Sequence, residues 1–365
     1  MFFEIQKDAI TEGMSKIVPI TERRSPLPIL THALIEVRDN VLLITATDLE
    51  VGIRAIYNCE NSSEGFATVP ARKFLEIVKE LSPGPVRIEL TDRFRIKITS
   101  GRSSFDIAGM DPSDFPAWAN IEDVDTHEIP CEKIVHMLDK TLFASSNDDS
   151  RFNLNGVLIE KNENQTRFVA TDGHRLALID EKIDIPLDLK VIAPKKGLLE
   201  LKRLLEGQKD KAEIGFDRKN LVVKTSKAMM TIRLIEGDYP DYLRVLPTDK
   251  AKMILAKRNV LLQSLKRMAI LTSDRNKGVN VTIKSDQIEF SVNHPDLGAA
   301  NDIIEVEYKD EEEINLILNV VYMMDAIINI ELENIYIEYY KEGAPIKFIA
   351  GPDSNYFSIV MPMRK

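Results

Sequence analysis

The stretch TRFVATDGHRLALID (166–180) has two counterparts in the same chain, LLITATDLEVGIRAI (42–56) and IEFSVNHPDLGAAND (288–302). Each copy joins a strand-like apolar run to a polar turn, and the copies start 124 and then 122 residues apart. Similarity within one chain at a nearly fixed spacing is the signature of a repeat architecture. The stretch therefore predicts three copies of one domain.

Helical segments recur at the same spacing. A short strand that leads into an amphipathic helix is indicated at IQKDAITEGMSKIV (5–18), IPCEKIVHMLDKTL (129–142) and LAKRNVLLQSLKRM (255–268). A second helical segment follows in each copy, at 69–81, 192–205 and 318–330. We therefore expect an α+β fold of three similar domains, at 1–124, 125–250 and 251–365. Each should hold two helices packed on about eight short antiparallel strands.

Several strands are predicted to form hairpins. LIEVRDNVLLITAT (34–47) alternates apolar and polar residues on both sides of Asp39-Asn40, as a two-residue turn requires. Similar patterns occur at 85–100, 211–226 and 280–293. The segments between the domains, 119–128 and 246–252, are short and polar, so we expect the domains to be fixed neighbours.

Composition excludes several classes of protein. The 365 residues are 44% hydrophobic and carry a net charge of −10, which is too apolar for a disordered chain. No apolar run approaches the length of a membrane span, and the first residues do not resemble a signal peptide. Two isolated cysteines, Cys59 and Cys131, cannot form a disulfide framework. We expect a cytoplasmic protein.

The sequence offers little catalytic chemistry. It contains no P-loop, no Rossmann glycine fingerprint and no serine-hydrolase elbow, and its five histidines lack metal-site spacing. We predict neither a metal nor a cofactor. Asp172 and His174 could act as an acid–base pair, so a hydrolase is the alternative from the enzyme class. However, Thr-Asp recurs at Thr47-Asp48 without a histidine, which favours a turn-forming role for the aspartate.

Basic residues concentrate on the predicted helices although the whole chain is acidic. One helix carries Lys195, Lys196, Lys202 and Arg203, and another carries Lys257, Arg258, Lys266 and Arg267. Positive helices with acidic strands and loops suit a polyanion that lies on the helical face. No recognition-helix motif accompanies them, so contacts to phosphates, without sequence specificity, are expected.

Taken together, these segments resemble the bacterial DNA polymerase III beta subunit family, the replicative sliding clamps. The motifs that carry the resemblance include SPLPIL (25–30), VPARKF (69–74), VATDGHRLA (169–177), DYPDYLRVLP (238–247) and VMPMR (360–364). The resemblance implies a ring of two head-to-tail subunits around duplex DNA, with helices lining the hole and no catalysis. It also implies as partners the polymerase III alpha subunit, an ATP-driven clamp loader, and other polymerases and repair proteins. The implied location is the bacterial cytoplasm, at the nucleoid during replication.

The resemblance assigns three sets of residues. A peptide-binding groove is implied at Leu154, Thr171, Gly173, His174, Arg175, Leu176, Pro240, Arg244, Val245, Tyr322, Ile359, Met361, Pro362 and Met363. DNA contacts are implied at Arg24, Arg72, Lys73, Arg151, Lys195, Lys196, Arg275 and Lys277. The dimer seam is implied at Lys73, Arg102, Phe105, Ile107, Ile270, Leu271, Asp296 and Asp302.

The expected seam differs from its family pattern in charge. Family members often place an acid-rich stretch where this chain reads PDLGAAND (295–302), and a basic residue where it has Ser104. We therefore expect an apolar seam, with Lys73 and Arg102 facing Asp296 and Asp302. The remaining alternative is a peptide-binding scaffold that does not act on DNA.

Overall fold

The computed structural model describes residues 1–21, 25–91, 94–119, 121, 123–162, 165–187, 190–273 and 277–363. The chain forms two compact units, which are described separately here. Unit 1 comprises Met1–Ile134, Asp184–Leu187 and Lys196–Leu234. Unit 2 comprises Val135–Ile183, Asp188–Lys195 and Ile235–Lys365.

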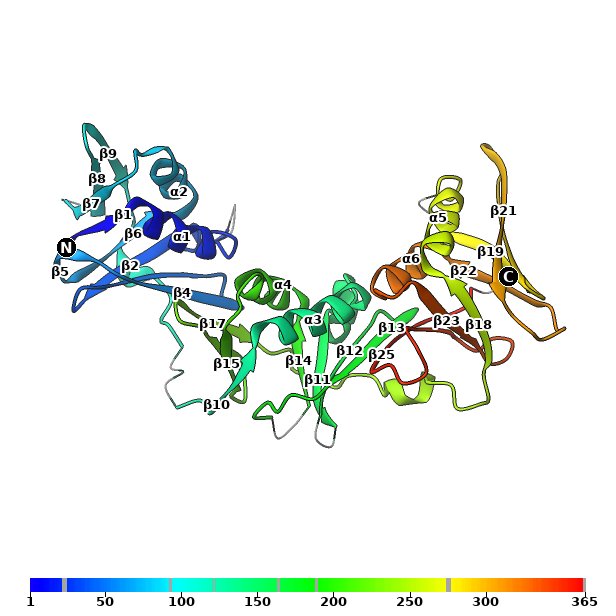
Figure 1. Ribbon diagram of the computed structural model, residues 1–365. Coiled ribbons are helices and arrows are strands. Elements are labelled where there is room, and N and C mark those ends of the chain that lie inside the picture. The colour runs from blue at the N-terminus through cyan, green and yellow to red at the C-terminus, as the bar shows by residue number, and fades with distance from the viewer. Residues whose placement is uncertain are drawn as a thin grey trace. The chain divides into compact units, whose positions relative to one another are not determined.

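One order of elements occurs three times along the chain (Figure 1). The first copy contains β1 (Phe2–Gln6), α1 (Lys7–Ile17), β2 (His32–Arg38), β3 (Val41–Thr47), β4 (Val51–Asn58), β5 (Glu60–Ser63), β6 (Gly65–Pro70), α2 (Ala71–Glu80), β7 (Pro85–Leu90), β8 (Arg95–Ser100) and β9 (Ser103–Ala108). The second contains β10 (Thr126–Pro130), α3 (Cys131–Thr141), β11 (Gly156–Asn162), β12 (Gln165–Thr171), β13 (Arg175–Glu181), β14 (Val191–Pro194), α4 (Lys195–Leu205), β15 (Lys211–Phe216), β16 (Asn220–Lys224) and β17 (Ala228–Arg233). The third contains β18 (Lys252–Lys257), α5 (Arg258–Ala269), β19 (Gly278–Lys284), β20 (Gln287–His294), β21 (Gly298–Glu307), β22 (Ile314–Asn319), α6 (Val320–Ile328), β23 (Asn334–Tyr339), β24 (Ile346–Ile349) and β25 (Tyr356–Val360).

The expected α+β fold is thus confirmed, and so is its repetition. Within each copy, a strand, a helix and three strands occur twice, and the first copy adds the short strand β5. The predicted turn at Asp39-Asn40 is also confirmed, because both residues have positive φ, 48° and 61°, as a two-residue turn of type I′ requires.

Unit 1 contains two antiparallel sheets. The smaller has the strand order β5-β1-β7-β8-β9, so β9 lies at its edge. The larger has the order β10-β15-β16-β17-β4-β3-β2-β6 and continues from the second copy into the first where β17 pairs with β4. Gly52 lies opposite Thr231 in this pairing, which we call the first junction.

Unit 2 contains a sheet of twelve strands, in the order β14-β11-β12-β13-β25-β24-β23-β18-β21-β20-β19-β22. Here β13 of the second copy pairs with β25 of the third, and Leu176 lies opposite Ile359. We call this pairing the second junction. At both junctions the fourth strand of one copy's first half meets the last strand of the next copy.

Apolar side chains hold the helices against the sheets. In α1 the buried residues are Ile10, Gly13, Met14 and Ile17, the spacing of one helical face. Helix α1 packs against α2, and α5 packs against α6. No helix within the described ranges is long and apolar enough to cross a membrane.

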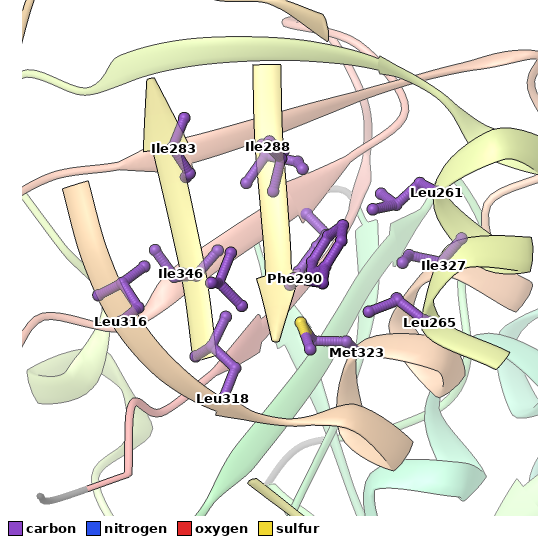
Figure 2. A pocket seen from close by; sticks show the side chains of 13 residues that line it. Leu261, Leu265, Ile283, Ile288, Phe290, Leu316, Leu318, Met323, Ile327 and Ile346 are labelled. Atoms are coloured by element: carbon purple, nitrogen blue, oxygen red, sulfur yellow. The ribbon is translucent and has the colours of Figure 1, made fainter. Parts of the chain in front are cut away.

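The third copy has a small internal void in its core. Figure 2 shows apolar side chains from α5, α6 and the strands around it, among them Leu265, Phe290 and Met323. The void measures about 20 Å³, and its lining offers no polar surface to a water molecule. It is a packing defect and does not form a ligand site.

Candidate functional site

The second copy's turn between β12 and β13 is held by Asp172. Its Oδ1 accepts hydrogen bonds from the backbone N–H groups of His174 (2.9 Å) and Arg175 (3.1 Å). Gly173 has a φ of +87°, a conformation that glycine adopts without strain. In the first copy, Asp48 Oδ1 accepts in the same way from the N–H groups of Glu50 and Val51. The predicted turn-forming role of both aspartates is confirmed.

Arg175 connects this turn to helix α6. Its Nε donates to Asp172 Oδ2 at 3.0 Å, and its Nη1 donates to Asp325 Oδ2 on α6. The guanidinium also stacks on Tyr322, with 4.4 Å to the ring centre, and lies 5.6 Å from the ring centre of Phe143. Burial and the charge of Asp172 raise the pKa of the Tyr322 hydroxyl. The stack therefore places the uncharged ring of Tyr322 against the guanidinium of Arg175.

The residues after β25 extend the same surface. The N–H of Met361 donates to the carbonyl oxygen of His174 at 2.8 Å, and the N–H of Met363 donates to that of Ile317 at 2.8 Å. These backbone bonds fix the path of residues 361–363 between the Asp172 turn and strand β22. Met363 keeps 38% of its surface exposed, so an adaptable apolar side chain faces the solvent there.

An apolar cluster supports the surface from below. Leu154, Leu176 and Ile359 are buried in one cluster together with Tyr239 and Tyr242. Burial and a hydrogen bond to Glu160 raise the pKa of Tyr242 to about 12. Three of the predicted groove residues are therefore supporting residues packed beneath the exposed ones.

The short helix Tyr242–Val245 supplies exposed groups at the rim. Val245 is 44% exposed, and Arg244 forms an ion pair with Asp241 at 2.8 Å. Pro240 is exposed next to the buried Tyr239. Thr171 donates to the carbonyl oxygen of Arg175 at 2.6 Å, so its role is to close the turn.

Sequence reasoning missed several neighbours of this surface. Leu243 and Phe152 are each 57% exposed, and Phe152 lies against Gly237. Asp325 and Phe143, which hold Arg175, were also missed. Leu243 could have been found, because an apolar residue in the loop unique to the second copy is a binding signal. The others lie far away in the sequence and left no spacing signal.

The predicted DNA contacts on helices α2 and α4 have partners within the chain. Lys73 pairs with Glu76, and Arg72 donates to the carbonyl oxygen of Thr21 at 3.2 Å. Lys195 donates to Asn147 Oδ1 at 2.8 Å, and burial lowers the pKa of its ammonium group.

Lys196 pairs with Asp48, whose side chain is fully buried. Asp48 therefore holds the β3–β4 turn and also positions a lysine of α4.

The remaining predicted DNA contacts differ in position. Arg151 donates from Nη1 to the carbonyl oxygen of Asp172 at 3.1 Å, so it lies against the turn described above. Lys277 is partly buried, and its carbonyl oxygen accepts from the N–H of Val320 at the start of α6. Arg24 and Arg275 lie outside the described residues.

The residues predicted for the dimer seam include large exposed apolar groups. Phe105 is 38% exposed on the edge strand β9, near Ile107, and Ile270 is 75% exposed at the end of α5. Leu271 is partly exposed beside it. Exposed large apolar side chains at a sheet edge, as at Phe105, and at a helix end, as at Ile270, are typical of an interface.

The charged residues predicted for this seam differ in whether they already have a partner within the chain. Asp302 accepts from Arg267 of the same chain, and its interactions with Ser264 and Arg267 lower the pKa of its carboxyl group despite partial burial. Asp296 is exposed in the turn after β20, and Arg102 is exposed before β9.

The geometry does not favour the acid–base pair Asp172 and His174. Both carboxylate oxygens of Asp172 already accept from the turn and from Arg175. Within the described residues, no group of three or more His, Cys, Asp or Glu side chains could hold a metal ion. The site is therefore suited to binding.

Comparison with known proteins covers most of the chain. The DNA polymerase III beta subunit family matches through its N-terminal domain at 1–119, its central domain at 128–241 and its C-terminal domain at 243–364. The beta sliding clamps of Pseudomonas aeruginosa and Escherichia coli are 33% and 30% identical, over 100% of each chain. The solved beta subunit of Pseudomonas aeruginosa is 31% identical over 100% of both chains, with a TM-score of 0.96.

The repeated fold and these matches define a protein of three clamp domains. The sliding clamp of Bacillus subtilis has the same fold, with a TM-score of 0.95 at 28% identity, covering 100% of this chain and 99% of that one. The chain belongs to the DNA polymerase III beta subunit family.

Proposed function

We propose that two copies of this chain close head to tail into a ring that encircles duplex DNA and tethers the replicative polymerase. The observation that carries the proposal is the repetition of one junction. Strand β4 pairs with β17, and β13 pairs with β25, so each copy joins the next through equivalent strands. A third junction of the same kind would require β21 and β9, which are the equivalent strands that remain.

Both remaining strands have free edges. Strand β9 lies at the edge of its five-stranded sheet, where it pairs only with β8 among the described residues. Strand β21 pairs along its length with β20, but with β18 only at Val306 and Glu307. Free strand edges are templates for pairing with another chain. If β21 of each subunit pairs with β9 of the other, two chains of three domains form a closed ring of six.

The repeat also gives the register of this third junction. At the first junction Arg54 lies opposite Met229. Alignment of the repeats places Ala300 at the position of Arg54, and alignment of hairpin β8–β9 with β16–β17 places Ser104 at that of Met229. Ser104 of one subunit should therefore lie opposite Ala300 of the other.

Cysteine cross-linking tests this pairing. The variant Ser104→Cys with Ala300→Cys should form a covalent dimer on oxidation, because strand neighbours bring Cα atoms within disulfide range. The native Cys59 and Cys131 are buried and should not interfere. The matched control, Ser104→Cys with Asp296→Cys, is out of register and should cross-link poorly. A chain that sediments as a monomer, or equal cross-linking of both pairs, would contradict the proposed ring.

The basic residues support a role on DNA. Lys73, Lys195 and Lys196 lie in the first turn of α2 or α4, where the positive end of the helix dipole also favours anions. Contacts of this kind to phosphates give affinity without sequence specificity. A ring that encircles DNA does not need tight contacts to stay on it. Lysines that also have partners within the chain, and so bind phosphates more weakly, are consistent with this.

The surface around Arg175 supports peptide docking. Leu243 and Val245 are exposed on the short helix whose Tyr242 packs in the apolar cluster, and Met363 is exposed after β25. Arg175 stacks on Tyr322, and anchored groups among adaptable apolar side chains suit varied partners. We propose that it binds peptides of the polymerase III alpha subunit, the clamp loader, and other polymerases and repair proteins. The protein would act without catalysis in the bacterial cytoplasm, at the nucleoid during replication.

The domain limits proposed for the ring are 1–124, 125–250 and 251–365. The element order supports them, because each span contains one complete copy of the repeated order. The boundary between the two compact units falls within the second span. One part of this span pairs with the first copy through β17 and β4, and another part pairs with the third copy through β13 and β25.

A further inference from the structure

A separate cavity lies beside the first junction. It has a volume of about 240 Å³ and is formed by the β3–β4 turn, residues 116–119 and strands β16 and β17. None of the residues assigned above to peptide, DNA or the seam lines it. It therefore lies outside the three surfaces that the proposed clamp function uses.

Trp118, the single tryptophan of the chain, forms one wall of this cavity. The guanidinium of Arg54 lies 4.6 Å from its ring centre, and Arg54 is itself held by a 3.0 Å hydrogen bond from Nε to Thr45 Oγ1. A Cβ at Gly52 would lie 3.1 Å from the ring and 2.9 Å from Thr231 Oγ1. The glycine thus leaves the space that the indole ring and the Thr231 hydroxyl occupy.

Leu49 lines the cavity with an exposed apolar side chain on an unusual backbone conformation. Its φ is +76°, a left-handed conformation that disfavours side chains with a Cβ, and its side chain is 53% exposed. The equivalent position in the second copy is Gly173, which has a φ of +87°. The first copy therefore keeps a strained leucine at the cavity where the repeat uses an unstrained glycine. Strain of this kind is concentrated at functional sites.

The charged groups of the lining favour an anion. Lys219 and Arg233 are exposed there, and neither forms an ion pair within the part of the chain that is described. Glu50 is the one acidic residue among those that line the cavity. Two cations face one carboxylate, and a free hydroxyl at Thr231 adds a hydrogen-bond donor.

We propose that this cavity binds a small planar aromatic anion, with its ring against Trp118 and its charge beside Lys219 and Arg233. An aromatic wall with an exposed apolar side chain and two cations at the mouth is complementary to such a molecule. The volume lies just below the roughly 300 Å³ at which sites for drug-sized ligands begin. One ring system with one anionic group therefore fits better than a longer molecule.

The single tryptophan makes binding directly measurable. Protein labelled with 5-fluorotryptophan should give one ¹⁹F signal, which reports on the cavity alone. Two probes distinguish the source of the charge: phenyl phosphate carries a phosphate, and benzoate carries a carboxylate. At least one should shift the ¹⁹F signal, with a dissociation constant of about 1 mM or below, and the uncharged analogue of that anion, phenol or benzamide, should bind about tenfold more weakly.

Three variants test the residues. Lys219→Gln with Arg233→Gln should weaken binding of the anion about tenfold or more, whereas Arg218→Gln, on the same β15–β16 turn but outside the lining, should not. Leu49→Gly should weaken binding without lowering the thermal unfolding midpoint, because it removes the left-handed strain. The proposal is overturned if neither anion moves the signal, if the anion that binds is no tighter than its uncharged analogue, or if the double variant binds that anion normally.

Discussion

His294 holds its turn with the same pair of hydrogen bonds that Asp172 makes in the preceding copy of the repeat. Its Nδ1 accepts from the N–H groups of Asp296 (3.2 Å) and Leu297 (3.3 Å), two and three residues ahead. Asp172 Oδ1 accepts from the residues two and three ahead of it as well. The third turn thus uses an imidazole nitrogen as the acceptor where the other two use a carboxylate oxygen. It leads directly into β21, the strand of the proposed seam.

Loss of this cap should therefore weaken the proposed dimer. The variant His294→Ala leaves the N–H groups of Asp296 and Leu297 without their acceptor, in the turn that leads into β21. Sedimentation should show a dissociation constant that rises on the order of tenfold relative to the parent.

A matched variant isolates the effect of the cap. His294→Asp introduces the carboxylate cap of the other two copies and should give a dimer that dissociates like the parent. Peptide binding near Asp172 serves as the internal control, because that turn keeps its own cap. An alanine variant that dissociates like the parent would show that this cap does not support the seam.

Apolar contacts should dominate the seam. Ile270→Ala with Leu271→Ala should give monomers at about micromolar concentration, because removing two buried aliphatic side chains costs several kcal/mol. Ile270 is 75% exposed in the single chain, so the fold should be unaffected, which thermal unfolding can verify. The matched control is Val260→Ala, an exposed apolar residue elsewhere on α5.

The salt dependence separates apolar from ionic closure. Exposed ion pairs weaken as salt rises, whereas apolar burial is insensitive to screening. The dissociation constant should therefore change little with salt. Steep dissociation in salt would mean that charged groups hold the seam.

Removal of the last residues should abolish peptide docking. Deleting 361–365 removes Met361 and Met363 and their backbone bonds to His174 and Ile317. A polymerase-derived peptide should bind more weakly by about 2 kcal/mol or more for each anchor removed, while the dimer persists. Deleting only 364–365 is the control and should leave binding intact. Unchanged affinity of the longer deletion would place the peptide elsewhere.

Neutralising two lysines of α4 should weaken DNA retention. Lys195→Gln with Lys196→Gln should reduce the slope of log affinity against log salt by about 0.9 for each phosphate that the protein no longer neutralises. Glutamine is preferable to glutamate, since a carboxylate at position 196 would face the buried Asp48. Lys209→Gln, beyond the end of α4, should leave the slope unchanged. The assignment fails if both variants show the same slope as the parent.

The sequence was sufficient to predict the fold because its signals are local and repeated. Each helix that the apolar spacing indicated is present, and the capping roles of Asp48 and Asp172 followed from their recurrence. The cap at His294 was not predicted, because histidine is not among the usual turn formers.

The site was less predictable than the fold. Asp325 holds Arg175 from 150 residues away, and Asp48 holds Lys196 across the first junction. Such contacts depend on which strands pair, and single-sequence spacing carries no information on that. The cavity at Trp118 was missed for the same reason, since three distant segments build it.

The most direct test of the clamp is its retention on DNA of different topology. Protein loaded on nicked circular plasmid, with an ATP-driven loader, should stay bound through gel filtration and should be released when the plasmid is cut once. A closed ring cannot leave a circular plasmid but can slide off a linear end. Cutting the plasmid once should therefore release the protein, although the DNA sequence is unchanged. Equal retention on circular and linear DNA, or no retention on either, would contradict the account.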